Sequence, residues 1–325
     1  MILQVKELRV EFRTRRGTLV AVDGVSFSVA RGEVLGVVGE SGAGKSLTGL
    51  AIMGLLEPPG RIAAGEVWLE GRRIDALPHA ALRALRGRRI GVVFQDPLGS
   101  LNPLYTIGAQ LEETIRTHLG LAGKELRGRA LALLAEVGIP APQARFQHYP
   151  HQFSGGMRQR VVIALALAAE PILLIADEPT TALDVSMQAQ IIALIKRVAR
   201  ERGTAVMLIT HDMGVIAETA DRVAVMYAGR IVEIGAVGDV LHAPQHPYTA
   251  GLMASIPRIA AGAARSRLAQ IEGAMPRLNA IPRGCPFHPR CPKRFERCLG
   301  SRPELMPVGA SQAACWLHAS AIAQR

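Results

Sequence analysis

The stretch from Gly39 to Ser46 constrains this chain more than any other part of its sequence. It reads Gly-Glu-Ser-Gly-Ala-Gly-Lys-Ser, which fits the pattern G-x-x-x-x-G-K-[ST]. An apolar run over Glu33–Val38 precedes it, and a helical pattern over Lys45–Leu56 follows it. Glycines in such a loop let backbone N–H groups face phosphate oxygens, and the helix N-terminus adds partial positive charge. The sequence therefore predicts a phosphate-binding loop; a Gly-rich turn without a ligand is the less favoured alternative.

The last two residues of the motif have predicted roles in nucleotide binding. Lys45 is expected to bridge the β- and γ-phosphates of a nucleotide, and the Ser46 hydroxyl is expected to hold Mg²⁺. The predicted nucleotide-binding residues of the loop are Gly39, Glu40, Ser41, Gly42, Ala43, Gly44, Lys45 and Ser46.

A second acidic motif ends a buried strand. The apolar run Ile172–Ala176 is followed directly by Asp177 and Glu178. Ligands of open α/β sheets bind at the carboxyl ends of strands, so Asp177 is placed to hold Mg²⁺ and Glu178 to orient the attacking water. Alone this pattern is common, because strand ends are often acidic. Together with the Gly-rich loop it predicts nucleotide hydrolysis.

Composition supports a globular chain and narrows its partners. Of 325 residues, 49% are hydrophobic and 20% charged, which excludes wholesale disorder. Aromatic residues make up only 4%, which disfavours base stacking on single-stranded nucleic acid. The formal net charge of +11 fits a nucleic acid, an anionic membrane surface, a nucleotide or simply a solvated basic surface.

The sequence shows no membrane-spanning segment and no signal peptide. Its most apolar stretch, Val161–Ala176, is interrupted by Glu170 and Pro171 and is shorter than the roughly 20 apolar residues that a spanning helix needs. The first residues carry charges at Lys6 and Glu7, unlike a secretory leader. We expect a chain that starts and stays in the cytosol.

Periodicity predicts an α/β fold with a helical insertion. Short strands fill the first ninety residues, helical spacing dominates residues 97–152, and strand–helix alternation resumes at Ser154 and ends in a hairpin over Arg222–Ile234. Such alternation implies a parallel sheet with helices on its faces. The predicted domains are a core over 1–96 and 154–240, a helical subdomain over 97–153, and a loop-rich C-terminal extension over 241–325.

Several further motifs resemble those of the ATP-binding-cassette (ABC) family. Phe153–Arg160 looks like the family signature, and Gln95, Thr181–Asp184 and His211 match its other motifs in identity and order. This resemblance covers about residues 1–240. It implies a RecA-like P-loop core with an antiparallel β subdomain, together with a helical signature subdomain.

The resemblance implies roles for these residues. Ser154, Gly155 and Gly156 would meet the γ-phosphate bound by a second protomer, so that two cassettes sandwich two nucleotides. Gln95 would contact Mg²⁺ and the water, and His211 would contact the γ-phosphate. Asp184 would order the dimer interface. Taken singly, each has a structural alternative, such as a solvated turn glutamine or a structural histidine.

Two positions depart from the family pattern. Phe153 and Met157 stand where the commoner signature has Leu and Gln, but neither position carries the phosphate contact. The family also stacks adenine on an aromatic residue about thirty positions before the P-loop lysine. Here that position falls near Arg16, whose guanidinium can stack on a base, with Phe12 as the nearest aromatic.

Additional motifs are similar to ATP-binding subunits of bacterial peptide and nickel importers (dipeptide and oligopeptide permease ATPases). They are Gln95–Pro103, His246–Thr249 and Gly284–Pro292. This similarity implies a second ATPase subunit, identical or different, two transmembrane permease subunits and an extracytoplasmic substrate-binding protein. It places the chain peripherally at the cytoplasmic face of the inner membrane, with ATP and Mg²⁺ as cofactors and no nucleic-acid partner.

The four cysteines form one C-terminal cluster: Cys285, Cys291, Cys298 and Cys315. Four thiolates suit a [4Fe–4S] cluster or tetrahedral zinc, and a loop-rich segment benefits from such a staple. Some members of the importer subfamily hold an iron–sulfur cluster there. Zinc and reduced thiols without metal remain alternatives.

The sequence thus predicts the ATPase subunit of an ABC importer for dipeptides, oligopeptides or a similar small solute. One alternative is a soluble ABC ATPase acting on DNA or ribosomes, which would explain the charge. A second is a non-catalytic regulatory cassette, against which the intact Lys45, Asp177, Glu178 and His211 argue.

Overall fold

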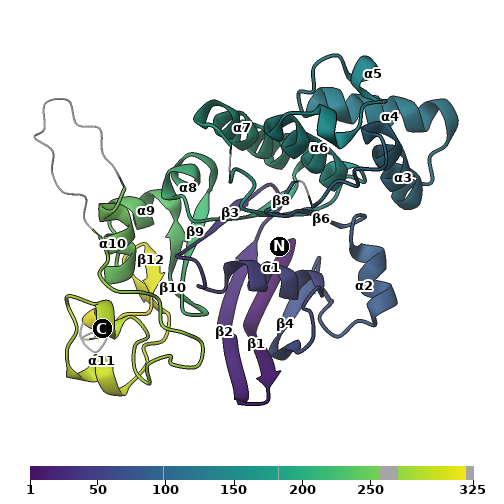
Figure 1. Ribbon diagram of the computed structural model, residues 1–325. Coiled ribbons are helices and arrows are strands. Elements are labelled where there is room, and N and C mark those ends of the chain that lie inside the picture. The colour runs from purple at the N-terminus through teal and green to yellow at the C-terminus, as the bar shows by residue number, and fades with distance from the viewer. Residues whose placement is uncertain (98, 182, 257–269, 320–325) are drawn as a thin grey trace, which may run out of the picture. The chain divides into compact units, whose positions relative to one another are not determined.

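The computed structural model describes residues 1–325 except 98, 182, 257–269 and 320–325 (Figure 1). Its described chain forms two compact units. Unit 1 comprises Met1–Gln4, Ser28–Val34 and Trp68–Ile209, and unit 2 comprises Val5–Phe27, Leu35–Val67 and Thr210–Arg325.

The centre of unit 1 is a set of parallel strands. β7 (Leu173–Asp177) pairs with β6 (Ile90–Val93) on one side and with β8 (Ala205–Thr210) on the other. Leu173 to Ala176 are fully buried, as a strand covered on both faces requires. β7 therefore carries the pair Asp177–Glu178 to the carboxyl edge of these strands, as the sequence predicts.

Helices of unit 1 gather beside these strands (Figure 1). α3 (Ile107–Leu119) and α4 (Gly123–Glu136) contact each other, and both contact α6 (Gly155–Leu167), which also packs on β6. Thr106 caps α3 by accepting a hydrogen bond from the Ala109 N–H at 3.2 Å. The remaining elements of unit 1 are β5 (Arg72–Arg73), α2 (His79–Leu85), α5 (Pro142–Arg145), a 3-10 turn at Pro150–Gln152 and α7 (Val185–Arg202).

Unit 2 holds the N-terminal strands and the phosphate-binding loop. β1 (Leu3–Thr14) lies between β2 (Gly17–Val29) and β4 (Gly60–Leu69). β3 (Val34–Val38) is buried throughout and leads into the loop. α1 (Lys45–Met53) ends earlier than the predicted Leu56, because Gly54 adopts φ 62° and turns its N–H back to the Ala51 carbonyl.

A second set of strands in unit 2 connects the loop to the C-terminal extension. β9 (Arg222–Tyr227) runs parallel to β3 and forms the predicted hairpin with β10 (Arg230–Ala236). β12 (Ser311–Ala313) then pairs with β10, and β11 (Met306–Val308) pairs with β12. The extension is therefore not only loops: it adds two short strands to this sheet. With three residues each, these strands show no alternation that the sequence could reveal.

Short helices complete unit 2. They are α8 (Met213–Thr219), α9 (Val237–His242), α10 (Pro247–Ala254), α11 (Glu296–Gly300) and 3-10 turns at His288–Arg290 and Trp316–His318. Part of the predicted loop-rich region over 258–284 lies outside the described residues.

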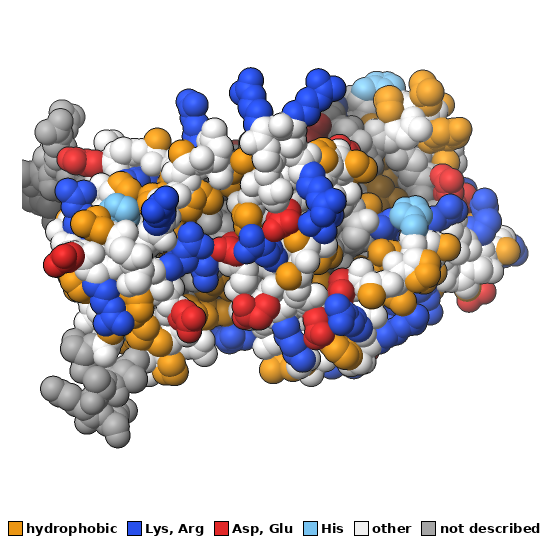
Figure 2. Space-filling view, turned by 90° about the horizontal axis from the view of Figure 1, so that it is seen from below, with side chains coloured by type: hydrophobic (Ala, Val, Ile, Leu, Met, Phe, Trp, Pro, Cys, Tyr) orange, Lys and Arg blue, Asp and Glu red, His pale blue; other side chains and the backbone are white. Residues whose placement is uncertain are grey.

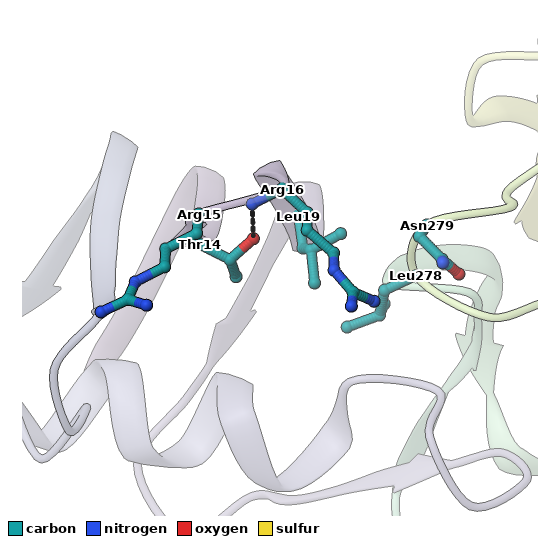
Figure 3. Close-up of a pocket in the computed structure, with 6 residues that line it drawn as sticks. All are labelled: Thr14, Arg15, Arg16, Leu19, Leu278 and Asn279. Carbon is teal, nitrogen blue, oxygen red and sulfur yellow. Dashed lines mark hydrogen bonds between the residues drawn. The ribbon is translucent and has the colours of Figure 1, made fainter.

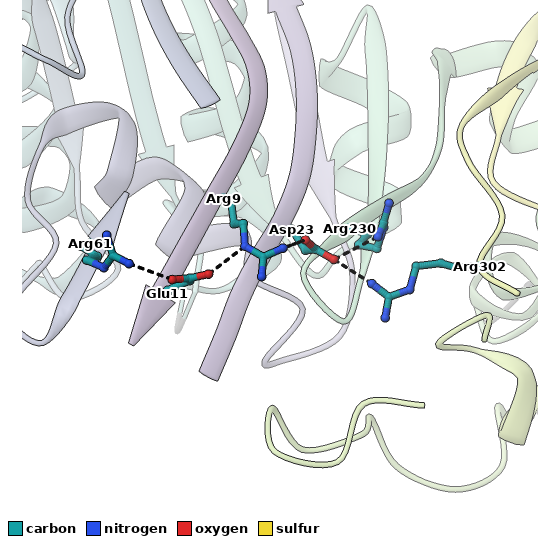
Figure 4. Close-up of polar contacts among 6 residues, drawn as sticks. All are labelled: Arg9, Glu11, Asp23, Arg61, Arg230 and Arg302. Carbon is teal, nitrogen blue, oxygen red and sulfur yellow. Dashed lines mark hydrogen bonds and ion pairs between the residues drawn. The ribbon is translucent and has the colours of Figure 1, made fainter. Parts of the chain in front are cut away.

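Asp23 ties the strands of unit 2 to the extension through three arginines (Figure 4). Its carboxylate accepts from Arg9 at 2.8 Å, from Arg230 at 3.0 Å and from Arg302 at 2.7 Å. Because the carboxylate is only 19% exposed, this network is better shielded from water than a surface pair. It joins β2, β10 and the segment before β11 at one charged centre.

Among the residues that the structure describes, no helix combines the length and apolarity that crossing a membrane would take.

A buried histidine at the start of α10 makes stability depend on pH. Burial, with a smaller contribution from the charge of His318, lowers the pKa of His246 to about 3, and its Nδ1 accepts from the Tyr248 N–H at 3.0 Å. The unfolded chain takes up a proton below about pH 6.5, whereas the folded chain does not. We predict that the free energy of unfolding falls as pH drops from about 6.5 towards 3, by up to about 1.4 kcal/mol per pH unit from this group.

Urea unfolding at about pH 7 and about pH 5.5 measures this slope. In His246→Asn, whose amide oxygen can accept the same hydrogen bond without titrating, the pH dependence should be weaker than in the wild type. His242→Asn, at an exposed position of α9, should keep the wild-type slope. Equal slopes in all three proteins would contradict the prediction.

Candidate functional site

The loop from Gly39 to Ser46 has the geometry of a phosphate cradle. Gly39, Gly42 and Gly44 adopt φ values of 153°, 83° and 99°, which side chains with a Cβ rarely tolerate. Lys45 is only 6% exposed, and its ammonium donates to the Gly39 carbonyl at 2.8 Å and to the Glu40 carbonyl at 3.1 Å. The loop's own carbonyls thus hold the lysine over the concave side of the turn.

Close packing explains why glycine is required at the first loop position. A Cβ on Gly39 would lie 2.2 Å from the Met226 carbonyl oxygen of β9, and that backbone oxygen cannot rotate away. A Cβ on Gly42 would meet no atom within 4 Å. The loop is therefore pressed against β9 at one end and open to a ligand in its middle.

His211 lies in the same unit as the loop, at the junction of β8 and α8. It is exposed, and the next residue, Asp212, caps α8 by accepting from the Gly214 N–H at 2.7 Å. The cap fixes the backbone at the end of the strand, where the sequence predicts a phosphate-contacting histidine. The role of His211 stays a prediction.

Unit 1 brings Gln95 and Glu178 together. The Gln95 Nε2 donates to Glu178 Oε2 at 3.2 Å, and the Thr181 hydroxyl donates to the same oxygen at 2.8 Å. Asp177 ends β7 one residue earlier. Glu178 adopts φ 48°, a left-handed conformation that costs about 1–3 kcal/mol for a residue with a Cβ. The backbone turn after β7 thus aims the carboxylate at Gln95.

The signature residues form the N-terminus of α6. Ser154 is the N-cap, and its Oγ accepts from the Met157 N–H at 3.4 Å. Gly155 is exposed, with no atom within 4 Å of a Cβ placed there, whereas a Cβ on Gly156 would meet Met187 at 2.6 Å. Phe153, which replaces the usual leucine of the signature, is 2% exposed, so its ring lies in the interior of unit 1.

Asp184 caps the neighbouring helix α7. Hydrogen bonds from the Ser186 hydroxyl and from the Met187 N–H lower the pKa of Asp184, which stays ionised. Its motif neighbour Ala182 lies outside the described residues. Asp184 is thus the N-cap of α7, the helix whose Met187 packs closely against Gly156 of the signature.

Arg16 lines a cavity of about 620 Å³ in unit 2. The turn between β1 and β2 supplies Thr14, Arg15 and Arg16, with Leu19 following in β2 (Figure 3). The C-terminal extension supplies Leu278 and Asn279 on the other side. The Arg16 N–H is fixed by the Thr14 hydroxyl at 3.2 Å. A guanidinium facing an apolar side chain can hold a planar base.

The four cysteines line one small cavity of unit 2, as free thiols. Burial raises the pKa of Cys285 to about 11 and also raises those of Cys291 and Cys315, so these thiols are protonated at neutral pH. Within the described part of the chain, no group of three or more His, Cys, Asp or Glu side chains is placed to hold a metal ion as it stands.

The predicted site residues divide between the units. Unit 2 contains the phosphate-binding loop, Arg16, His211 and the cysteines, while unit 1 contains Gln95, Asp177, Glu178, Ser154, Gly155, Gly156 and Asp184.

Two family profiles match successive parts of the chain. The ABC transporter family profile matches residues 22–181, and the profile of the oligopeptide/dipeptide transporter C-terminal region matches residues 232–298. The dipeptide transport ATP-binding protein DppD of Haemophilus influenzae is 48% identical to this chain, over 97% of this chain and 94% of its own length. The chain belongs to the ABC transporter family.

Further relatives agree with that assignment. The oligopeptide transport ATP-binding protein OppD of Salmonella typhimurium is 48% identical over 93% of this chain and 90% of its own. A dimeric ATP-binding cassette solved with ADP and Pi in a post-hydrolysis state aligns with a TM-score of 0.66 and 29% identity, covering 73% of this chain and 99% of that chain. The predicted family and its α/β P-loop fold are confirmed.

The cassette also contains site residues to which the sequence assigned no role. The Tyr248 hydroxyl accepts from the Glu40 N–H at 2.9 Å, and Arg290 pairs with the Glu40 carboxylate at 2.9 Å. Both residues lie inside the match to the oligopeptide/dipeptide transporter C-terminal region and inside the two C-terminal motifs singled out from the sequence, which gave the only signal for them. Their contact with a loop more than 200 residues earlier depends on the tertiary structure.

Two of the three glycines of the loop, Gly39 and Gly42, provide a matched test. We predict that Gly39→Ala lowers the free energy of unfolding by about 2 kcal/mol or more and abolishes nucleotide binding, because its Cβ collides with the β9 backbone. Gly42→Ala carries only the left-handed backbone penalty, about 1 kcal/mol. Urea unfolding and equilibrium nucleotide binding compare the two. Equal losses would refute the packing argument.

Proposed function

We propose that this chain is the ATPase subunit of an ABC importer that takes up dipeptides, oligopeptides or a similar small solute. The observation that carries the proposal is an intact phosphate cradle, with Lys45 held by the Gly39 and Glu40 carbonyls. It lies in a chain that matches dipeptide transport ATP-binding proteins over 97% of its length.

Phosphate binding follows from charges already in place. Lys45 is buried and oriented, so it exchanges carbonyl partners for phosphate oxygens with little rearrangement. The N-terminus of α1 follows the loop directly, and its backbone N–H groups would add partial positive charge for a phosphate. The lysine neutralises the charge that develops as the terminal phosphoryl group leaves.

The hydrolytic water would be aligned by Glu178. The amide of Gln95 and the hydroxyl of Thr181 both donate to one oxygen of Glu178, and the carboxylate held in this way would accept a hydrogen bond from the water. This arrangement fixes the carboxylate against rotation. The oxygen ligands Ser46, Gln95 and Asp177 match what Mg²⁺ prefers and would hold the ion, which supplies further charge neutralisation when bound.

A second cassette would complete the site. Ser154, Gly155 and Gly156 present a helix N-terminus whose first glycine is exposed and unobstructed, which suits an approaching γ-phosphate. A homologous cassette is known as a dimer with ADP and Pi. With a partner cassette, two permease subunits and an outer binding protein, this subunit would lie peripherally at the cytoplasmic face of the inner membrane. His211 would contact the γ-phosphate and Asp184 would order the interface.

Adenine would occupy the cavity beside Arg16. The guanidinium of Arg16 can stack on the base, while Leu19 and Leu278 offer apolar contact. The volume of about 620 Å³ is ample for a purine.

The cysteines would hold a [4Fe–4S] cluster, with zinc or no metal as alternatives. Support comes from four thiols that line one cavity, three of them buried and Cys291 partly exposed, and from the importer motif around Cys285. Because the cavity is only about 10 Å³, the thiols must move apart and lose their protons to bind the group. The group would act as a staple for a segment with few regular elements.

The alternative function, an ATPase acting on DNA or ribosomes, draws on the net charge of +11. On the face seen in Figure 2, however, basic side chains are interspersed with acidic ones and form no continuous strip. Nucleic-acid binding relies on such a strip.

Uptake of a labelled dipeptide by cells lacking this chain tests the proposed function. Wild-type protein should restore uptake, whereas Glu178→Gln should bind ATP, join the permeases and lower ATP turnover about 100-fold or more. Glu201→Gln, exposed at the end of α7, should behave as wild type. Normal turnover in Glu178→Gln would remove Glu178 from its role. DNA-stimulated ATPase activity without permease binding would favour the alternative.

Anaerobic purification tests the cysteine proposal. We predict broad visible absorbance with about four iron and four sulfide per chain, lost in Cys298→Ser. Stoichiometric zinc without visible absorbance would support the zinc alternative. Reactive thiols without either metal would refute both.

A further inference from the structure

Glu40, the second residue of the P-loop, is held on two sides by the C-terminal extension. Its backbone N–H donates to the Tyr248 hydroxyl at 2.9 Å. Both oxygens of its carboxylate accept from the guanidinium of Arg290, at 2.9 Å and 3.1 Å. Two-point contact of this kind fixes orientation as well as position.

Arg290 is itself rigidly placed. Its Nε donates to the Glu272 carbonyl at 2.9 Å, and its guanidinium lies 5.8 Å from the centre of the Tyr227 ring. The side chain is 7% exposed, so water screens its charge poorly. The ion pair with Glu40 is therefore a shielded contact of fixed geometry.

The cysteine segment positions Arg290. This residue precedes Cys291 directly and ends a 3-10 turn, in which its N–H bonds to the Phe287 carbonyl at 3.0 Å. Cys285 begins the turn, since its carbonyl accepts from the His288 N–H at 3.0 Å. The turn that joins Cys285 to Cys291 is thus the same turn that aims Arg290 at the P-loop.

The contact reaches the lysine of the P-loop through Glu40. The Glu40 carbonyl accepts from the Lys45 ammonium at 3.1 Å, one peptide away from the N–H that Tyr248 holds. The carboxylate of Glu40 would repel the negative charge of a triphosphate in this loop. Pairing with Arg290 cancels that charge, so Arg290 serves both geometry and electrostatics.

We propose that Arg290 and Tyr248 are positioning residues of the ATP site, through which the C-terminal cysteine segment sets nucleotide affinity. The inference rests on the proposed function, since it assigns these residues to the same P-loop. They touch the loop and act through Glu40 and Lys45. The alternative is that the ion pair between Arg290 and Glu40 only anchors the C-terminal extension to the loop, without an effect on nucleotide affinity.

Nucleotide affinity and steady-state ATPase of the assembled importer test the proposal. Arg290→Ala should raise the Kd for ATP and KM about 10-fold while kcat at saturation changes less than about 2-fold, because a repulsive carboxylate is left beside the phosphates. Tyr248→Phe, which keeps the buried ring, should raise Kd about 3-fold. Arg294→Ala, an exposed arginine of the same segment, should match wild type.

The decisive result is a reversal. Glu40→Gln should tighten ATP binding in the Arg290→Ala background, because it removes the uncompensated charge, but should not tighten it in the wild-type background. An anchoring role alone gives no such rescue. Unchanged Kd in Arg290→Ala and Tyr248→Phe, or no rescue by Glu40→Gln, would overturn the proposal.

Further variants and the behaviour of the wild-type importer separate misfolding, failure of the proposed function and failure of this inference. If Arg290→Ala does not fold, Arg290→Lys, which keeps the charge but loses the two-point contact, and Tyr248→Phe decide. Failure of the wild-type importer to bind or hydrolyse ATP would defeat the proposed function itself, whereas normal wild-type behaviour with indifferent variants would defeat only this inference.

Discussion

The buried ammonium of Lys45 is the interaction on which the site depends. A charged amine in a buried position is costly unless polar partners replace its water. Here the Gly39 and Glu40 carbonyls, at 2.8 Å and 3.1 Å, supply those partners. They can do so only because the loop curls, and it curls because glycine occupies the positions with positive φ. The glycine pattern thus fixes the shape of the loop, and the shape of the loop fixes the position of the lysine charge.

The Glu178 group of unit 1 depends on backbone strain rather than on glycine. Glu178 keeps a left-handed conformation although it has a Cβ, and its N–H bonds to the Ile209 carbonyl of β8 at 2.8 Å. A hydrogen bond to a neighbouring strand, together with bonds from Gln95 and Thr181, stabilises a backbone that is unfavourable alone. This conformation fits the role proposed for Glu178.

The sequence was sufficient to predict candidate site residues where a motif consists of consecutive residues. The loop over Gly39–Ser46, the pair after β7 and the cap of α6 follow from motif and local context, and the family that they imply is confirmed. The pairing of Glu40 with Arg290 could not be predicted, since charge complementarity across 250 residues has many equivalent solutions until the chain folds. Likewise, the sequence could not predict that Arg16 and Leu278 line the same cavity, because they lie more than 250 residues apart in the chain.

The extension illustrates why a small appendage can matter to a distant loop. Its interior rests on the rings of Tyr227, Tyr248 and Phe287, whose centres lie 4.7 Å to 5.4 Å apart. Tyr227 belongs to β9, the strand that also presses on Gly39. A change in the cysteine turn that shifts Phe287 would therefore be passed on to Tyr248, Arg290 or the strand beneath the loop, because these side chains pack against one another. Under the proposed role of Arg290, the chemistry of the thiols and the affinity of the nucleotide site would be coupled through this packing, without a contact between them.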